Sequence, residues 1–422
     1  MFGKEIVEFS QNLESLRDFI ELVDQHVDDK NKEEMEKSPE SFLPILLAMN
    51  SMDPEKFELP DDLDDKFKQE LDKLDLQVEL VESSKDGVEK EYSVKMSDET
   101  GAMFMKSLDV LNRKQTRTSS LYQNSLISVI SYVEWFLAQL IHKYYDQNPN
   151  AVGIKDKQLS LDDLYELGSI EDARKFLIDS KVESIMRSNI ESWVKFFKEQ
   201  VKLSMGYLSE HMNDMTEACQ RRNLYVHNGG TVNSIYIKNC HFLPDAKEQI
   251  GSKIDTDREY IEKTISTFER CFILVASELW KKNEPNSESR YKVLKALAEE
   301  HIDQGRYDIA ESLSYFLCGD KQNSEFQLLM AKMNYWYAIK AQGKLSKVNK
   351  DIEKEDMTAR PSIFKFMKAN LLSDFELSCE YLDELLHTKQ LSHEELMSNV
   401  VYKDLVSSDE FTEKFDSRSE EN

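Results

Sequence analysis

Residues 221–230 read Arg221-Arg222-Asn223-Leu224-Tyr225-Val226-His227-Asn228-Gly229-Gly230. No other part of the 422-residue chain places several candidate catalytic groups so close together. A polar residue, Asn223, directly follows Arg222, and four residues separate Arg222 from His227. The two glycines are expected to end a helix just past His227, because glycine adopts the left-handed backbone conformation of a helix end without steric cost. The alternative interpretation is a helix end with a surface arginine pair and a histidine cap.

These residue types suit the cleavage of RNA without a metal ion, in which the 2′-hydroxyl attacks the adjacent phosphorus. Imidazole can take the hydroxyl proton or protonate the leaving oxygen, because its pKa lies near neutrality. Guanidinium keeps its charge and can stabilise the phosphorane through two parallel hydrogen bonds. On a regular helix Arg222 and His227 lie about 140° apart, although the long arginine side chain can fold back. Asn223 and His227 share a face, so Asn223 could orient the imidazole or hold a phosphate oxygen.

Glu134 is an acidic residue within the strongest helix that the sequence predicts, residues 118–146. Its line on that helix also holds Ile127, Ile130, Leu137 and Ile141. A buried unpaired charge is costly, so a cation should face Glu134 unless it reaches solvent at the edge of the stripe. A second predicted helix, residues 207–227, continues its apolar face to Arg222. The two stripes therefore predict an ion pair between Arg222 and Glu134.

At these residues the chain resembles the HEPN superfamily. The signature of that family is an arginine, a polar residue and, after four to six intervening positions, a histidine; Arg222, Asn223 and His227 fit it. The sequence pattern Arg-Asn-x-x-Val-His-Asn-x-Gly is also typical of the family. The helix that contains Val133-Glu134 looks like the family's earlier helix, which carries an acidic residue. The resemblance covers residues 107–282.

The resemblance implies a helical bundle that dimerises and places two motifs in one composite cleft. Catalytic members are metal-independent endoribonucleases, found as toxins and in defence against phage. Carried over, Arg222 would stabilise the transition state and His227 would be the acid or base. Asn223 would complete the catalytic set, and Glu134 would orient Arg222. Two neighbours are expected to support the site, Asn228 and Arg221, the latter also as an alternative to Arg222.

The composition favours a helix-rich globular protein, with 12 Gly, 8 Pro and 32% charged residues. The net charge of -26 is uneven: residues 1–100 hold 12 basic and 29 acidic side chains, and the rest hold 42 and 51. Such a chain is not drawn to nucleic acid over long range, so RNA binding would need a local basic patch. The charge argues against a general RNA-coating protein and less against an enzyme with a small cleft.

Five cysteines lie far apart, without a Cys-x-x-Cys pair, so neither a disulfide framework nor a zinc site is expected. Reduced thiols indicate the cytoplasm, and Cys219, on the apolar stripe of the motif helix, is expected to be a buried structural thiol. We find no signal peptide and no apolar run of about 20 residues, so no membrane segment is expected. No cofactor or metal is expected.

Changes of pattern along the chain predict a mainly α fold with four segments. Residues 1–105 form an acidic α+β accessory domain, in which residues 76–96 alternate as a β-hairpin around Ser84-Lys85-Asp86-Gly87. Residues 106–283 form the HEPN-like antiparallel bundle, followed by the linker Asn283-Glu284-Pro285-Asn286-Ser287. Residues 288–415 form paired helices, and residues 416–422 form a frayed tail.

In the predicted paired helices, Ala298, Gly305, Tyr307 and Ala310 follow the order of small residue, glycine, aromatic and small residue. A similar apolar helix starts at Ala331, 33 residues after Ala298. In this order and spacing the paired helices resemble tetratricopeptide repeats. Further expectations concern single elements. Helices are predicted at 163–178, 181–205, 256–282, 361–373 and 375–388, an extended run at 232–237, and loops at 28–40 and 346–359.

Two functions remain open. The first is a HEPN-type endoribonuclease that acts on RNA as a homodimer, with the C-terminal helices as a sensor or partner-binding arm. The second is a non-catalytic dimerisation or interaction protein that binds a nucleotide or a protein partner. The two differ in whether His227 is exposed beside Arg222 or packed in the core. A third interpretation is an unrelated all-helical scaffold.

Overall fold

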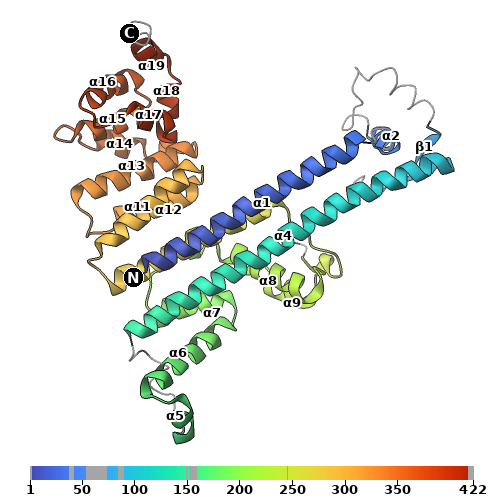
Figure 1. Ribbon diagram of the computed structural model, residues 1–422, viewed down its shortest axis with the longest axis horizontal. Coiled ribbons are helices and arrows are strands. Elements are labelled where there is room, and N and C mark those ends of the chain that lie inside the picture. Colours follow the sequence, from blue (N-terminus) through green and yellow to red (C-terminus); the bar gives the residue numbers. More distant parts are fainter. Residues whose placement is uncertain are drawn as a thin grey trace. The chain divides into compact units, whose positions relative to one another are not determined.

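The computed structural model describes residues 2–37, 42–53, 74–83, 90–148, 151, 159–244 and 246–416. Helices dominate these residues, and the strands among them form a single two-stranded sheet (Figure 1). The expectation of a mainly α fold is therefore confirmed. The predicted turn at 84–87 and the predicted tail after Asp416 lie outside the described residues.

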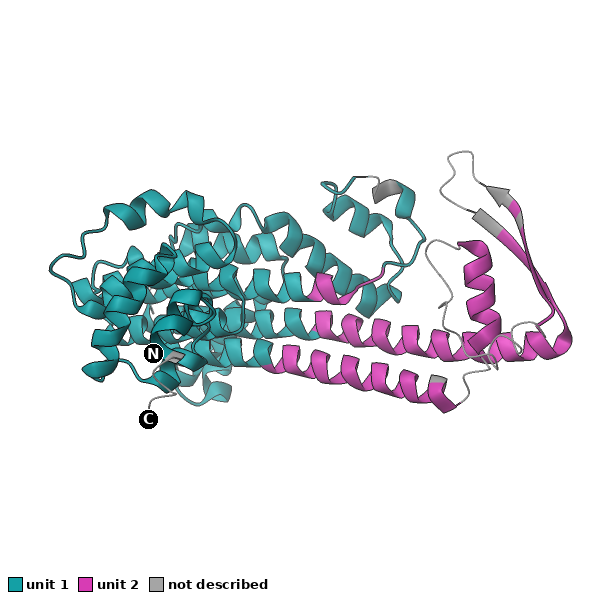
Figure 2. Ribbon diagram, turned by 90° about the horizontal axis from the view of Figure 1, so that it is seen from above, with its two compact units in different colours: residues 1–14, 128–254, 262–422 teal, residues 15–127, 255–261 magenta. Residues whose placement is uncertain are grey.

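The chain divides into two compact units (Figure 2). Unit 1 holds residues 1–14, 128–254 and 262–422, and unit 2 holds residues 15–127 and 255–261. This division differs from the predicted boundary after residue 105, because helix α4 (Asp98–Gln147) continues without a break across it. Helices α1 (Gly3–Lys37) and α10 (Arg258–Asn283) also contribute residues to both units.

Unit 2 is built on an antiparallel pair formed by α1 and α4. Tyr122 donates a hydrogen bond from its hydroxyl to Asp24 at 2.7 Å, and Lys114 forms an ion pair with Asp28 at 2.8 Å. The prediction of a loop at 28–40 is wrong for residues 28–37, because α1 continues to Lys37. Glu and Lys have high helix propensity, and charged side chains on an exposed helix face need no burial.

The rest of unit 2 contains helix α2 (Leu43–Met52) and the strands β1 (Leu76–Ser83) and β2 (Lys90–Met96). The strands pair antiparallel and confirm the predicted hairpin. Residues of the two alternating runs face one another directly, as Leu76 with Met96, Val78 with Val94 and Leu80 with Tyr92.

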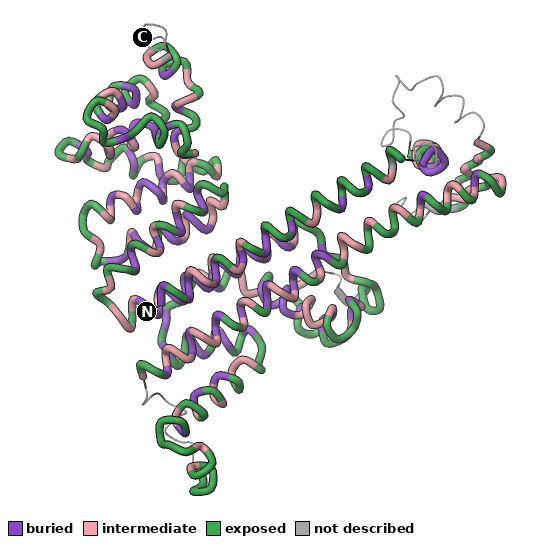
Figure 3. The backbone as a smooth tube through the Cα atoms, in the orientation of Figure 1, coloured by how far each residue is buried: buried purple, intermediate pink, exposed green. Residues whose placement is uncertain are grey.

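The core of unit 1 is a helical bundle. It contains the start of α1, the second half of α4, α8 (Met212–Asn228) and α10. Phe9 of α1 stacks on Phe136 of α4 with ring centroids 4.2 Å apart. Of the apolar residues predicted to share a line with Glu134 on α4, Ile130, Leu137 and Ile141 are fully buried and Ile127 is half-buried. Figure 3 shows buried positions recurring along this helix.

Helix α4 is long and apolar enough to cross a membrane by length and composition, and no other helix in the described ranges meets that test. Half of its apolar window is buried inside the protein. The core helix of a protein meets the same test, so its packing in the bundle accounts for its apolar character.

The single helix predicted at 181–205 is wrong. Helix α6 (Ile170–Met186) ends before Asn189, which caps a new helix, α7 (Ile190–Lys195), by accepting a hydrogen bond from the Ser192 amide at 3.1 Å. A π-helical turn follows at Phe196–Gln200, and a separate short helix, α5 (Leu161–Leu167), precedes α6. A capping side chain such as Asn189 starts a new helix and so ends the preceding one. The prediction used only apolar periodicity, which does not detect such caps.

The C-terminal part of unit 1 consists of paired helices. Helices α11 (Glu288–Asp303), α12 (Tyr307–Cys318) and α13 (Glu325–Ala341) pack in succession, as do α15 (Ser362–Leu371) and α16 (Phe375–His387). The loop predicted at 346–359 is partly wrong, because it contains α14 (Asn349–Lys354), whose Ile352 is fully buried. The chain continues through α17 (His393–Ser398), α18 (Lys403–Val406) and α19 (Asp409–Phe411).

Buried charges hold the paired helices onto the bundle. Glu269 of α10 is fully buried, accepts a hydrogen bond from Ser10 at 2.7 Å and lies 3.4 Å from His301 of α11. Arg306 donates to the second ring nitrogen of His301 at 3.0 Å and pairs with Glu14 at 2.6 Å. Since a buried charge without a partner is strongly destabilising, this chain of contacts fixes α11 against α1 and α10.

The predicted linker is held by a second buried ion pair. Arg290 of α11 donates to Asp320 at 2.7 Å, and both side chains are at most 3% exposed. The same guanidinium donates to the carbonyl oxygens of Glu284 and Pro285 at 2.7 and 2.9 Å. Residues 283–287 are therefore a fixed turn in the structure.

Candidate active site

Helix α8 carries the motif and ends where the sequence predicts. Gly229 has a φ of 54° and Gly230 a φ of 76°, and the Gly230 amide donates to the Leu224 carbonyl at 3.0 Å. A Cβ atom at Gly230 would lie 3.0 Å from the Tyr225 ring. Both the left-handed backbone and the close ring therefore favour glycine here. The helix end leaves His227 in its last turn.

The ion pair predicted between Arg222 and Glu134 is confirmed. Arg222 Nη2 donates to Glu134 Oε1, which joins α8 to α4. The side chains are 21% and 34% exposed, so the pair lies at the edge of the core. Arg222 Nε is buried and has no hydrogen-bond partner among the described residues. The guanidinium is thus oriented by one carboxylate and keeps a donor that the described protein atoms do not use.

Arg221 is held on a different side of the motif helix. Its Nε donates to Glu217 Oε1 at 2.7 Å, and the Tyr236 hydroxyl donates to the same oxygen at 2.7 Å. Glu217 is buried, and burial, followed by the charge of Glu217, raises the pKa of Tyr236. Arg221 therefore connects α8 to α9 (Ser234–Asn239), and this engagement counts against Arg221 as the alternative to Arg222.

His227 is exposed, as the enzyme hypothesis requires. Asn223, one turn earlier on its face, is half-buried, and Asn228 is exposed. The Asn228 amide donates to the Thr231 carbonyl at 2.5 Å, which ties the end of α8 to the following segment. Across the described residues, no hydrogen bond or ion pair joins His227 to Arg222, in keeping with their separation around the helix.

Cys219 lies one turn before Arg222 and is buried, as expected. Burial raises the pKa of the Cys219 thiol to about 12, although the Arg222 guanidinium lowers it. The thiol is therefore neutral near pH 7 and is part of the packing between the helices, because only a thiolate is an effective nucleophile.

Lys253 is a cation near the motif that sequence reasoning missed. Its ammonium group donates to the Gly229 carbonyl, and the residue is exposed. Paired backbone places it there: the Ile254 amide donates to the Gly230 carbonyl at 2.9 Å, and the Val232 amide donates to the Ser252 carbonyl at 2.9 Å. No local pattern marks Lys253, because it approaches the motif from more than 20 residues downstream.

The prediction of extended backbone at 232–237 is wrong from Ser234 onward, because these residues belong to helix α9. The Asn233 side chain caps this helix by accepting hydrogen bonds from the Ile235 and Tyr236 amides at 3.1 and 3.0 Å. Tyr236 and Ile237 pack with Leu224 of the motif helix. Cap and burial together override the strand preference of the β-branched residues.

Three exposed apolar side chains lie on the helices that form the motif region. Val226, next to His227, is 48% exposed; Trp135, next to Glu134, is 36% exposed; and Ile235 of α9 is 65% exposed. Exposed apolar groups that gather near one site are typical of surfaces that bind another protein.

No protein-family model, no curated protein and no solved structure matches this chain.

Proposed function

We propose that the protein is a metal-independent endoribonuclease of the HEPN type that acts as a homodimer. One observation carries the proposal: Arg222 and His227 lie near the end of one helix, and Arg222 is paired with the carboxylate expected to orient it, Glu134. An exposed His227 supports the enzyme over the non-catalytic interaction protein, in which His227 would be packed in the core.

In the proposed reaction, the ribose 2′-hydroxyl loses a proton and the 5′-oxygen that leaves gains one; His227 makes one of these transfers, and water makes the other. The 2′-oxygen bonds to phosphorus, and the bond from phosphorus to the 5′-oxygen breaks. The products are a 2′,3′-cyclic phosphate and a 5′-hydroxyl. Arg222 stabilises the charge on the phosphorane, using the donors that Glu134 leaves free. Asn223 orients the imidazole or the phosphate.

A second copy of the chain completes the proposed site. Arg222 is drawn towards α4 by Glu134, while His227 points from the helix about 140° away. Two motifs that face each other across a two-fold axis would bring the Arg222 of one copy near the His227 of the other. The exposed apolar residues Val226 and Trp135 are suited to burial in that interface. Lys253 adds positive charge beside the RNA path.

We further propose that the protein acts as a toxin or as an anti-phage effector, with the C-terminal helices, which resemble tetratricopeptide repeats, as its sensor or partner-binding arm. The buried contacts of Glu269, His301 and Arg306 support this role, because they would transmit a displacement of α11 directly to the bundle.

The proposal is tested by RNA cleavage in excess chelator. The parent protein and His227→Ala are each incubated with total cellular RNA, and the fragment ends are identified. His387→Ala is the matched control, because His387 is also an exposed histidine in the last turn of its helix. We expect the parent and the control to produce 2′,3′-cyclic phosphates, and His227→Ala to be slower by about 100-fold or more. Equal cleavage by all three would reject the assigned site, and no cleavage by any would favour the non-catalytic interaction protein.

Mixing two inactive variants tests the composite site. Arg222→Ala and His227→Ala are unfolded and refolded together, so that half of the dimers are mixed. Each mixed dimer has one intact site of two if the residues come from different copies, so activity should return to about a quarter of the parent value. Mixtures as inactive as the single variants would show that Arg222 and His227 act within one chain.

A further inference from the structure

A second site lies in unit 1, apart from the motif. A pocket of about 570 Å³ opens between α10, α12 and the loop of residues 201–208. None of residues 221–230 lines it. Its volume falls in the range of pockets that enclose small molecules and cofactors, about 300–1,000 Å³.

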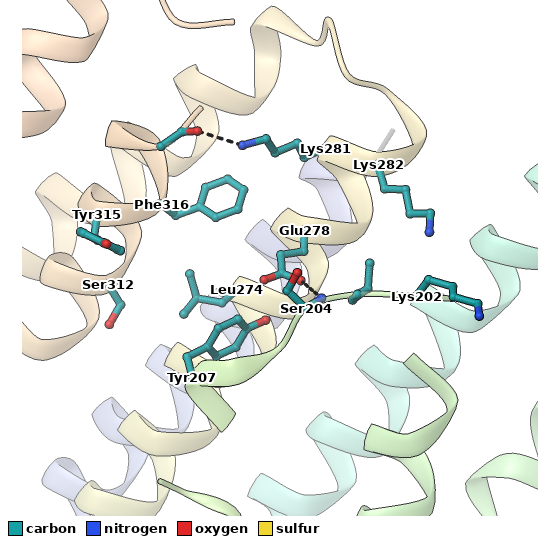
Figure 4. Close-up of a pocket in the computed structure, with 12 residues that line it drawn as sticks. Lys202, Ser204, Tyr207, Leu274, Glu278, Lys281, Lys282, Ser312, Tyr315 and Phe316 are labelled. Carbon is teal, nitrogen blue, oxygen red and sulfur yellow. Dashed lines mark hydrogen bonds between the residues drawn. The ribbon is translucent and has the colours of Figure 1, made fainter. Parts of the chain in front are cut away.

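The pocket has apolar walls around a polar interior. Leu274 of α10 and Phe316 of α12 face its centre, and Tyr315 lies at the α12 side (Figure 4). Aromatic and aliphatic walls of this kind bind flat rings, because they remove apolar ring surface from water and offer stacking contacts.

Two polar groups face the interior, the buried Tyr207 hydroxyl and the half-buried Glu278 carboxylate. The Tyr207 hydroxyl is buried and has no hydrogen-bond partner among the described residues, and burial raises its pKa. Glu278 accepts a hydrogen bond from the Ser204 amide at 3.1 Å, and burial raises the pKa of its carboxyl group. Figure 4 shows both side chains directed into the same space. A buried hydroxyl without a partner is costly, and a ligand that bonds to it removes that cost.

The loop that carries Ser204 and Tyr207 is conformationally strained. Lys202 has a φ of 65° and Met205 a φ of 46°, and neither is glycine. Non-glycine residues in the left-handed region are energetically unfavourable and cluster at functional sites such as ligand-binding loops. The strain is independent of the pocket geometry and indicates the same place.

Lysines provide positive charge on one side of the opening. Lys282 donates to the Val201 carbonyl. Lys281 donates to the Gly319 carbonyl at 3.0 Å and lies over the Phe316 ring. Lys202 is exposed with no ion pair among the residues described, so it is the group that can meet an anionic tail.

We propose that this pocket binds a planar heteroaromatic molecule whose ring edge carries adjacent N–H donors and a carbonyl oxygen, and whose tail is anionic. Glu278 accepts the N–H donors, and Tyr207 donates to the carbonyl oxygen. Phe316 and Leu274 enclose the ring, and Lys202 meets the tail. Guanine nucleotides and pterins with carboxylate tails share this chemistry. The proposal does not depend on the proposed cleavage activity.

Calorimetric titration of the full chain tests it with GMP, folic acid, AMP and guanosine. We expect GMP or folic acid to bind with a Kd below about 1 mM, and AMP, which lacks the donor edge, to bind at least about 10-fold more weakly. Binding of GMP alone would identify a nucleotide site, and binding of folic acid alone a pterin site. Guanosine should bind more weakly than GMP, and Lys202→Ala should remove that difference.

Variants place the binding in the pocket. Glu278→Gln should weaken binding about 10-fold or more, and Tyr207→Phe, which removes one oxygen atom, several-fold. Glu288→Gln alters an exposed carboxylate in the first turn of α11 and should change nothing. His227→Ala should also bind normally, which separates this site from the proposed catalytic one. Failure of GMP and folic acid to bind the parent would overturn the proposal, as would equal binding by AMP or by both pocket variants.

Discussion

For the proposed endoribonuclease, the pairing of Glu134 with Arg222 predicts that Glu134 affects cleavage through Arg222 alone. Removing the guanidinium in Arg222→Ala should slow cleavage about 100- to 1,000-fold, the usual cost of losing one transition-state donor. Glu134→Gln keeps the shape of the side chain but lets the guanidinium move. A misplacement of about 1 Å can cost up to about 100-fold, so we expect a loss of at least about 10-fold.

The double variant distinguishes positioning from an independent role. If Glu134 acts only by orienting Arg222, the double variant should cleave at the rate of Arg222→Ala. Independent effects would multiply and slow it by a further factor of 10, so the missing factor corresponds to a coupling of about 1.4 kcal/mol. The assay is single-turnover cleavage of a fluorescent RNA in excess chelator, with thermal melting of each variant.

Stability should change little in these variants. With side chains 21% and 34% exposed, the pair contributes only about 1 kcal/mol to folding once solvent screening is considered. The control is Asp214→Asn, which breaks an exposed 2.9 Å ion pair between Asp214, on the same helix, and Lys263. It should leave the rate unchanged. A parent-like rate for Glu134→Gln, or a double variant slower than Arg222→Ala, would refute the reasoning.

Three further predictions concern stability and pH. Asp320→Ala leaves the Arg290 charge buried and should destabilise α11 and α12 by about 3–5 kcal/mol, seen as faster amide hydrogen exchange there; protection equal to the parent would contradict it. Gly230→Ala forces alanine into a left-handed backbone and should cost about 1–2 kcal/mol in thermal melting, whereas an unchanged melting temperature would show that the turn can relax. The pKa of His211 is lowered below its ordinary 6.5, first by burial and then by the Arg270 guanidinium. The unfolded chain therefore binds the proton more readily than the folded chain, and stability is lost as pH falls below about 6.5. The His211→Gln variant should therefore lose less melting temperature than the parent between pH 7.5 and 5.5, and an equal loss would assign the effect to other groups.

Local pattern was sufficient where a helix or strand depends on its own side chains. The hairpin pairs Val78 with Val94 as the period of two requires, and α10 covers the predicted residues 256–282 within two residues at its start. The local sequence pattern gave wrong predictions where capping side chains or packing against distant residues determine the secondary structure. Asn189 divides the helix predicted at 181–205, and the segment at 232–237 is helical because its residues pack on Leu224.

The division of the chain could not be read from composition. The acidic residues 1–100 differ in charge from the rest, yet α1 and α4 each contribute to both units. Charge patterning reports which surface is solvated, whereas a unit is defined by which apolar faces bury one another. Phe9, from the acidic segment, stacks on Phe136 in the bundle.

The sequence by itself determined the mainly helical fold, the motif of Arg222, Asn223 and His227, and the partner of Arg222. It could do so because two helical periods placed Arg222 and Glu134 on core-facing stripes, and buried charges must pair. Only the tertiary structure decided that Arg221 engages Glu217 and that Lys253 meets the end of the motif helix. It also decided that α10 and α12 enclose a pocket. These features depend on which distant segments come together. Periodicity shows which face of a helix or strand is apolar, but it does not specify which other segment packs against that face.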